Sequence, residues 1–282
     1  MKMKPINPIV TYINIFLIAS KKCPSFITDI TITLPFIVIL VFTRPVYGTT
    51  IIALRDANQI IVGADSLVGN TAKKSDCKIR QVGSYFIAFA GYPFINTPTP
   101  ERFDIIDIFR QSIQGNQGTL KDKMLIFEPS IEAKLRTILE LTRGARKELF
   151  NTLYMQRDKI VLSVIVAGVE KKIPIFSTIE YQIVSSLDEP VRLKATPLDF
   201  TYAFPPNNPP DGILYGNHLE IEKIIKEEGI PKNIDPITTV LQWINLEIKA
   251  NPDRVGPPID ILRITPQGAE WIQQKKEYKE IQ

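Results

Sequence analysis

The sequence predicts a mixed α/β fold, a four-layer αββα sandwich of two antiparallel sheets. Short runs rich in β-branched residues come in two groups, and each group is followed by two segments with the apolar spacing of a helix. The first group places three strands within residues 50–90, so the connections between them are short. Parallel neighbours need longer crossover connections, and antiparallel pairing is therefore expected. Two antiparallel sheets buried between two helical layers account for this order of elements.

The first strand group begins with a hairpin. The runs 50–54 and 59–64 flank Arg55-Asp-Ala-Asn58, whose polar residues favour a turn. A third run, 85–90, ends at Gly91. These three strands are expected to pair in antiparallel fashion.

The remaining elements are predicted from the same periodicities. Helices are expected within 103–109, 131–149, 217–228 and 235–249. Strands are expected at 160–167, 173–178 and 259–265. The prolines of the segment 205–212 cannot continue a sheet or a helix, so a loop is expected there.

Residues 1–48 differ from the rest of the chain. They hold five basic residues and one acidic residue, a net charge of +4 that equals the formal net charge of the whole chain. Residues 49–282 are therefore formally neutral, and their charge gives no reason to expect a nucleic-acid partner. Their length suits one large domain with its own core.

The order of residues within 1–48 is typical of a secretory signal peptide. A basic lead precedes the apolar run 30–42, and Val46 and Gly48 then suit the two small-residue positions of a cleavage site. An uncleaved signal anchor and a self-processed propeptide are the alternatives, and all three place Thr49 at the boundary. Signal-peptide cleavage predicts an exported protein, periplasmic or secreted, that contacts the membrane only transiently. Otherwise a membrane-anchored or cytoplasmic protein is expected.

Cleavage between Gly48 and Thr49 would create an N-terminal threonine. A threonine hydroxyl is a poor nucleophile at neutral pH, but a free α-amino group with a pKa of about 8 can take its proton. Thr49 would then supply both the nucleophile and its general base.

Two charged residues can support Thr49. Asp65 ends the second strand of the hairpin, which returns to the point where the first strand begins. Lys78 heads a short strand that points to the same region, and a lysine beside the hydroxyl lowers its pKa if Asp65 balances the charge. Taken singly, each residue could instead be an ordinary loop acid or a solvated strand lysine.

Gly91 is the candidate oxyanion donor. A glycine at the end of a strand lets a substrate carbonyl approach the backbone, and its N–H can stabilise developing negative charge. A plain turn glycine is the alternative. Ser66 and Tyr92, which follow Asp65 and Gly91, are the expected substrate-binding residues.

Metal and cofactor chemistry are not expected. The chain has one histidine, His218, and two cysteines, of which Cys23 lies in the leader and Cys77 outside it. Residues 49–282 therefore cannot supply a zinc tetrad or form an internal disulfide. No glycine-framed serine accompanies His218, so this histidine is expected to cap or face a helix and not to serve a catalytic triad.

Four segments in this order resemble the signature of proteasome β subunits and their bacterial peptidase relatives. They are Gly48-Thr-Thr-Ile51, Gly63-Ala-Asp-Ser66, Cys77-Lys-Ile-Arg80 and Phe89-Ala-Gly91. The segment 255–268 is similar to the small-residue turn and strand near the C-terminus of that family. The chain departs from the family at Val255, where a serine is usual, and at Tyr215-Gly-Asn-His218, which replaces a serine-bearing glycine-rich stretch.

The resemblance implies the fold of N-terminal nucleophile (Ntn) hydrolases and hydrolysis of amide bonds through an acyl-enzyme. It implies that Thr49 is nucleophile and base, that Asp65 and Lys78 form the supporting ion pair, and that Gly91 is the oxyanion donor. The expected function is a threonine-type peptidase or amidase acting on a peptide or small amide without a cofactor. A small-amide acylase and a catalytically silent binding or assembly subunit are the alternatives. The family's rings also raise the expectation of a homo-oligomer.

Overall fold

The described part of the chain begins at Thr49. The computed structural model describes residues 49–67, 77–91, 94–95, 103–155, 159–202, 204–205, 210–230 and 235–275. These residues all belong to the second of the two units into which the chain divides, 44–282. The expected leader with Gly48, and the expected substrate-binding residue Tyr92, lie outside the described residues.

The first of two five-stranded antiparallel sheets in the described ranges has the strand order β10-β1-β2-β11-β12. Its strands are β1 (Thr50–Arg55), β2 (Ile60–Asp65), β10 (Asp211–Gly216), β11 (Ile259–Thr265) and β12 (Gly268–Gln273). The predicted hairpin of β1 and β2 is confirmed, with Ile51 opposite Ala64. Asp56 closes its turn by accepting the N–H groups of Asn58 (2.7 Å) and Gln59 (3.0 Å). The end of β2 therefore lies beside the start of β1.

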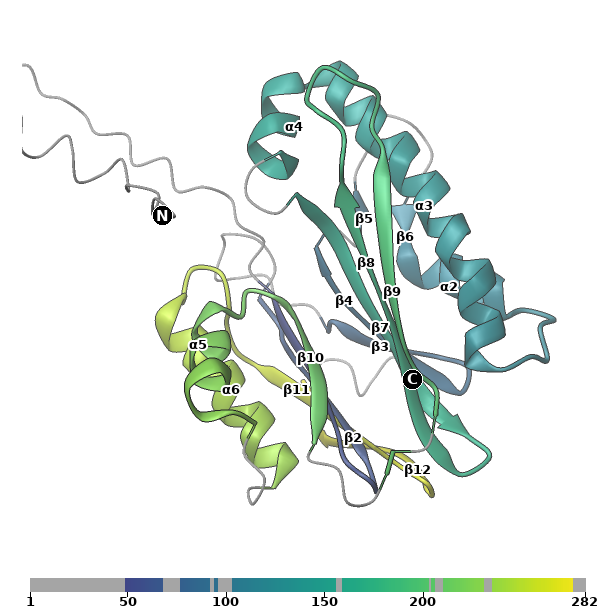
Figure 1. Ribbon diagram of the computed structural model, residues 1–282, viewed down its shortest axis with the longest axis vertical. Helices are drawn as coiled ribbons and strands as arrows, with labels where there is room; N and C mark the ends of the chain where they lie inside the picture. Colours follow the sequence, from purple (N-terminus) through teal and green to yellow (C-terminus); the bar gives the residue numbers. More distant parts are fainter. Residues whose placement is uncertain are drawn as a thin grey trace, which may run out of the picture. The chain divides into compact units, whose positions relative to one another are not determined.

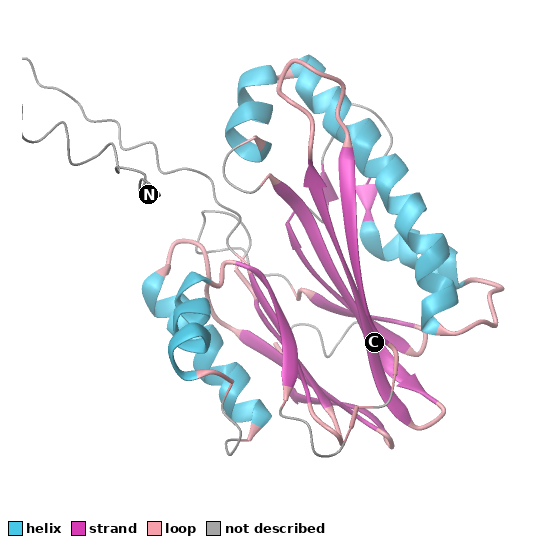
Figure 2. Ribbon diagram, viewed as in Figure 1, coloured by secondary structure: helices cyan, strands magenta, loops and turns pink. Residues whose placement is uncertain are grey.

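The second sheet has the strand order β3-β4-β7-β8-β9, and its strands are among those drawn in magenta in Figure 2. Its strands are β3 (Ile79–Val82), β4 (Tyr85–Gly91), β7 (Ile160–Glu170), β8 (Ile173–Ile183) and β9 (Leu193–Phe200). All of its pairings are antiparallel. The third strand expected in the first group, 85–90, belongs to this sheet as β4 and does not pair with the β1–β2 hairpin. A short antiparallel pair, β5 (Phe94–Ile95) and β6 (Phe103–Asp104), stands apart from both sheets.

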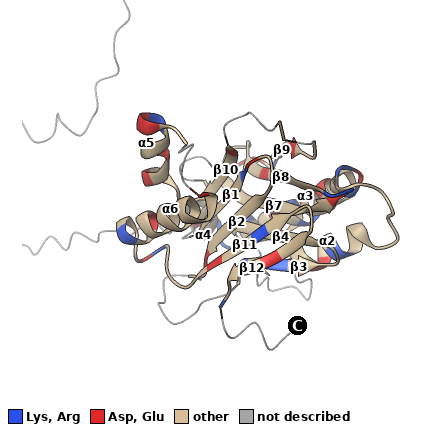
Figure 3. Ribbon diagram, turned by 90° about the horizontal axis from the view of Figure 1, so that it is seen from below, with Lys and Arg blue, Asp and Glu red and all other residues tan. Residues whose placement is uncertain are grey.

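Five helices fall within the described ranges. They are α2 (Ile105–Ile113), α3 (Leu120–Ala145), α4 (Lys147–Tyr154), α5 (Leu219–Glu228) and α6 (Pro236–Ala250). Side chains that prefer helix N-termini begin three of them: Asp104 caps α2, Thr119 forms a capping box with Asp122 at α3, and Asp235 caps α6. None of the described helices combines the length and apolar character needed to cross a membrane. Both α3 and α5 carry basic and acidic residues (Figure 3).

Figure 1 shows the sheets and helices as layers, and three groups of buried hydrophobic side chains hold these layers together. One group joins the inner faces of the sheets and includes Ile51 and Val62 from the first sheet and Phe86 and Ile165 from the second. A second group packs α5 and α6 on the outer face of the first sheet, and a third packs α2, α3 and α4 on the outer face of the second. The described residues therefore form a two-sheet sandwich with helices on both outer faces.

A buried arginine ties the two sheets together. Arg55, at the end of β1, donates to both carboxylate oxygens of Asp211 (3.1 and 2.8 Å) and to the carbonyl oxygen of Phe200 (3.1 Å). Its guanidinium carbon also lies 5.6 Å from the centre of the Phe176 ring, which belongs to the opposite sheet. A bidentate ion pair and a cation–π contact therefore fix the end of β1 that lies away from Thr49.

The structure also corrects several predicted boundaries. The helix expected across 131–149 is two helices, because the backbone breaks at Arg146 between α3 and α4. The helix expected from 103 starts at Ile105, because Asp104 is its N-cap. Asp211 and Gly212 begin β10 and so do not belong to the predicted proline loop.

Candidate active site

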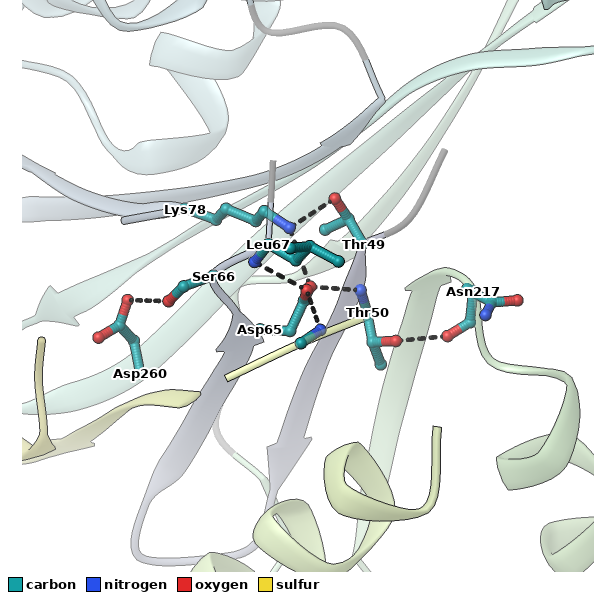
Figure 4. Close-up of polar contacts among 9 residues, drawn as sticks. Thr49, Thr50, Asp65, Ser66, Leu67, Lys78, Asn217 and Asp260 are labelled. Carbon is teal, nitrogen blue, oxygen red and sulfur yellow. Dashed lines mark hydrogen bonds and ion pairs between the residues drawn. The ribbon is translucent and has the colours of Figure 1, made fainter. Parts of the chain in front are cut away.

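Thr49 lies directly before β1, at the end of the sandwich where the hairpin strands begin and finish. Its side chain is 7% exposed, and its Oγ1 accepts a hydrogen bond from Lys78 Nζ at 2.8 Å (Figure 4). The carbonyl oxygen of Thr49 accepts the N–H of Asn217 at 2.6 Å, which attaches the residue to the turn after β10. The hydroxyl therefore has a fixed position beside a cation.

Asp65 is fully buried at the end of β2. Its Oδ1 accepts from Lys78 Nζ (2.9 Å) and from the N–H of Thr50 (2.8 Å). Its Oδ2 accepts from the N–H groups of Leu67 and Gly256, both at 3.1 Å. Burial raises the pKa of this carboxyl, whereas the Lys78 charge and the N–H donors oppose that rise. Four donors hold the carboxylate in one orientation.

Lys78 connects the other two residues of the site. Its side chain is 5% exposed, and its ammonium bonds both Thr49 Oγ1 and the Asp65 carboxylate. A buried cation without an anion would be costly, and Asp65 supplies that anion at 2.9 Å. The ammonium in turn favours the deprotonated form of the hydroxyl that it contacts. The predicted association of Thr49, Asp65 and Lys78 is thus present as direct contacts.

The contacts also show that Thr49 and its neighbour Thr50 differ in the partners of their hydroxyl groups. Thr50 is fully buried, its N–H donates to Asp65, and its Oγ1 donates to the carbonyl oxygen of Asn217 at 2.6 Å. Because side chains alternate along a strand, Thr50 points to the opposite face of the sheet from Thr49 and Ile51. Only Thr49 presents its hydroxyl to Lys78.

Gly91 ends β4 with a backbone φ of +107°, a conformation that favours glycine. A Cβ at this position would fall 2.4 Å from the carbonyl oxygen of Val161, so glycine is also required by close packing. Gly216 shows that the end of β4 lies close to Thr49. A Cβ atom placed on Gly216 would lie 3.3 Å from Cβ of Ala90, the residue before Gly91, and 1.9 Å from the carbonyl oxygen of Thr49. The end of β4 is therefore near Thr49, and the role of Gly91 as oxyanion donor stays a prediction.

Ser66 lies in the interior of the protein, directly after Asp65. It is fully buried, its hydroxyl donates to Asp260 at 3.3 Å, and its N–H donates to the carbonyl oxygen of Gly256 at 3.1 Å (Figure 4). Its expected role in substrate binding stays a prediction. Its partner is Asp260 of β11.

Three residues of the site were not singled out from the sequence: Asn217, Gly256 and Asp260. Asn217 belongs to Tyr215-Gly-Asn-His218, where a departure from the family was noted, but its contacts with Thr49 and Thr50 run through its backbone. Gly256 likewise acts through its N–H. Backbone contacts leave little trace in residue identity, so neither residue could be recognised from side-chain chemistry.

No protein-family model matches the chain, and no curated protein matches it. The site is therefore interpreted from its own geometry. Among the described residues, no group of three or more His, Cys, Asp or Glu side chains could hold a metal ion. His218 faces α5, as expected, with its Nε2 at 3.0 Å from Glu222 Oε1.

Along the inner face of the second sheet, β8 becomes less buried toward the Thr49 end. Along β8, the inward-facing Phe176 and Thr178 are fully buried, whereas Glu180, two residues further on, is half-buried. The outward-facing Ile179 and Tyr181 remain covered by helix α3. Glu180 pairs with Ser163 of β7, which pairs with Ala90 of β4 beside the Thr49 region.

Proposed function

We propose that this chain is a threonine-type Ntn hydrolase, a peptidase or amidase activated by cleavage between Gly48 and Thr49. The contact that carries the proposal is Lys78 Nζ to Thr49 Oγ1 at 2.8 Å, within a buried ion pair to Asp65 at 2.9 Å. A two-sheet sandwich with this threonine at the start of an inner strand is consistent with the Ntn fold.

Cleavage would convert an inert residue into a nucleophile with its own base. While Thr49 is joined to Gly48, its nitrogen is an amide and cannot accept a proton. A free α-amine, with an ordinary pKa of about 8, can take the proton of Oγ1 as that oxygen attacks a carbonyl carbon. Lys78 stabilises the negative charge on Oγ1 during this transfer.

The remaining steps use the same groups. The tetrahedral oxyanion would be stabilised by the N–H of Gly91, and the α-ammonium of Thr49 would return its proton to the leaving amine. The product is an ester between Oγ1 and the acyl group of the substrate. Water, activated by the regenerated α-amine, then hydrolyses that ester and frees the hydroxyl.

The leader belongs to the same proposal. Its basic and apolar order suits removal by a signal peptidase, which would expose Thr49 during export to the periplasm or the exterior. The substrate class is a peptide or a small amide. A small homo-oligomer acting on short substrates fits an exported enzyme better than a gated chamber.

Covalent labelling with a β-lactone probe tests this function. Thr49→Ala should abolish labelling of the processed chain, because the nucleophilic oxygen is gone, while circular dichroism stays unchanged. Thr50→Ser is the matched control, since it keeps the hydroxyl that bonds Asn217, and it should label as the wild type does. Undiminished labelling of Thr49→Ala would place the nucleophile elsewhere. Absence of labelling in the processed wild type would favour a silent binding subunit.

A further inference from the structure

Behind the ion pair lies a second buried polar group, centred on Asp260 of β11. Asp260 Oδ2 accepts the hydroxyl proton of Ser66 at 3.3 Å, and Oδ1 accepts the N–H of Lys275 at 2.9 Å. Both Asp260 and Ser66 are fully buried (Figure 4). Burial raises the pKa of the Asp260 carboxyl, while the N–H of Lys275 and the side chains of Cys77 and Ser66 oppose that rise.

The partners of Asp260 are the chain neighbours of the ion pair. Ser66 follows Asp65, and Cys77 precedes Lys78. The Cys77 thiol donates to the carbonyl oxygen of Ile79 at 2.8 Å, and the Asp260 charge helps to raise the pKa of this thiol. Asp260 therefore bonds the residue after the buried anion and acts electrostatically on the residue before the buried cation.

The strand that carries Asp260 is itself anchored to β2. In the antiparallel register, Ile259 lies opposite Asp65 and Asp260 lies opposite Ala64. Asp260 has the same orientation as Leu262, which lies in the hydrophobic group between the sheets. The carboxylate thus projects from a fully paired strand toward the interior, where it cannot swing away without breaking its bonds to Ser66 and Lys275.

We propose that Asp260 is a positioning residue for the threonine nucleophile, holding the Asp65–Lys78 pair in place through its bond to Ser66. The inference rests on the proposed function and assigns Asp260 no contact with substrate. A displacement of about 1 Å at a reacting group can reduce rate by on the order of 100-fold. Loss of Asp260 should therefore lower kcat by at least about tenfold, while KM changes by less than about threefold, because binding is not its role.

A double-mutant cycle on the processed enzyme tests the route through Ser66. Asp260→Ala and Ser66→Ala should each lower kcat, and the double variant should be no slower than Asp260→Ala alone, since the two act in one chain of contacts. Asp260→Asn, which keeps an oxygen for the Ser66 hydroxyl, should retain more activity than Asp260→Ala. Ser112→Ala is the matched control: it removes a buried hydroxyl that bonds Ile108 within α2 and should leave kcat unchanged.

The pH profile separates positioning from general stability. Because a displaced Lys78 stabilises the Thr49 oxygen less, the profile of kcat/KM for Asp260→Ala should shift toward higher pH. A lowered melting temperature with an unshifted profile, or additive losses in the cycle, would overturn the inference and leave the proposed function standing. If Asp260→Ala does not fold, Asp260→Asn and Ser66→Ala carry the same test. A wild-type enzyme without labelling or activity would overturn both.

Discussion

Under the proposed function, Lys78 is more than the counter-ion of Asp65. A lysine that only neutralises Asp65 would have no need to contact a threonine hydroxyl, yet its Nζ lies 2.8 Å from Thr49 Oγ1 and 2.9 Å from Asp65 Oδ1. The same ammonium therefore serves both groups. Its loss should act on the chemical step as well as on the free energy of unfolding.

Lys78→Ala should lower kcat by roughly 10²–10⁴-fold while KM changes little, because the lysine aids proton transfer in the transition state. It should also lower the free energy of unfolding by about 3–5 kcal/mol, since Asp65 loses its buried partner. Steady-state kinetics and urea unfolding measure the two effects. Lys121→Ala, which removes an exposed lysine 3.5 Å from Asp199, is the control and should change neither. Equal losses in kcat and in substrate affinity would indicate a structural lysine.

Cys77 adjoins the site but should be chemically inert. Burial, together with the Asp260 charge, raises the pKa of its thiol to about 12. The thiolate is the reactive form, so the native protein should not react with a thiol reagent at pH 8 and should gain reactivity only near pH 12. A Cys23→Ser background leaves Cys77 as the one cysteine, and denatured protein gives the full signal. Rapid labelling of the native protein at pH 8 would contradict this assignment.

Among the elements, α5 depends on a cap supplied from a different helix. His218 provides no side-chain cap at its start, and instead the fully buried Glu247 of α6 accepts the N–H groups of Glu220 (2.8 Å) and Ile221 (3.1 Å). A negative charge at a helix N-terminus is also favourable to the helix dipole. Asn217 lies two residues before the start of α5. The cap on α5 therefore also stabilises the turn in which the backbone of Asn217 bonds Thr49 and Thr50.

Glu247→Ala should therefore lower the free energy of unfolding by about 1–3 kcal/mol, because two buried N–H donors lose their acceptor. Urea unfolding followed by circular dichroism measures the change. Glu228→Ala removes an exposed glutamate from the other end of α5 and should be close to neutral. Equal stability of the two variants would show that the cap contributes nothing.

Elements with a clear apolar period were predictable, and those stabilised mainly by their partners were not. The β1–β2 hairpin, β7, β11 and α6 match the predicted runs closely. β9 was missed, because it is an edge strand in which Pro197 and several exposed residues leave no clear alternation. Its position comes from pairing with β8, which local sequence does not encode.

At the scale of the whole molecule, the order of strand groups and helical pairs was enough to predict a two-sheet sandwich. It was also enough to bring Thr49, Asp65 and Lys78 together, because the hairpin fixes where β1 begins and β2 ends. The contributions of Asn217, Gly256 and Asp260 required the tertiary structure, since they come from β10, β11 and their turns, more than 150 residues away. Contacts between segments far apart in the sequence leave no local pattern that sequence analysis can recognise, whether they run through backbone atoms or through a side chain such as that of Asp260.

The central claim is that cleavage after Gly48 frees Thr49 as the nucleophile, and N-terminal sequencing of the processed protein tests it most directly. We expect the mature chain to begin Thr49-Thr50-Ile51-Ile52. The structure contributes the physical reason, because only a free amine on Thr49 places a base on the residue whose hydroxyl already contacts Lys78. A mature chain that begins at any other residue would contradict the account.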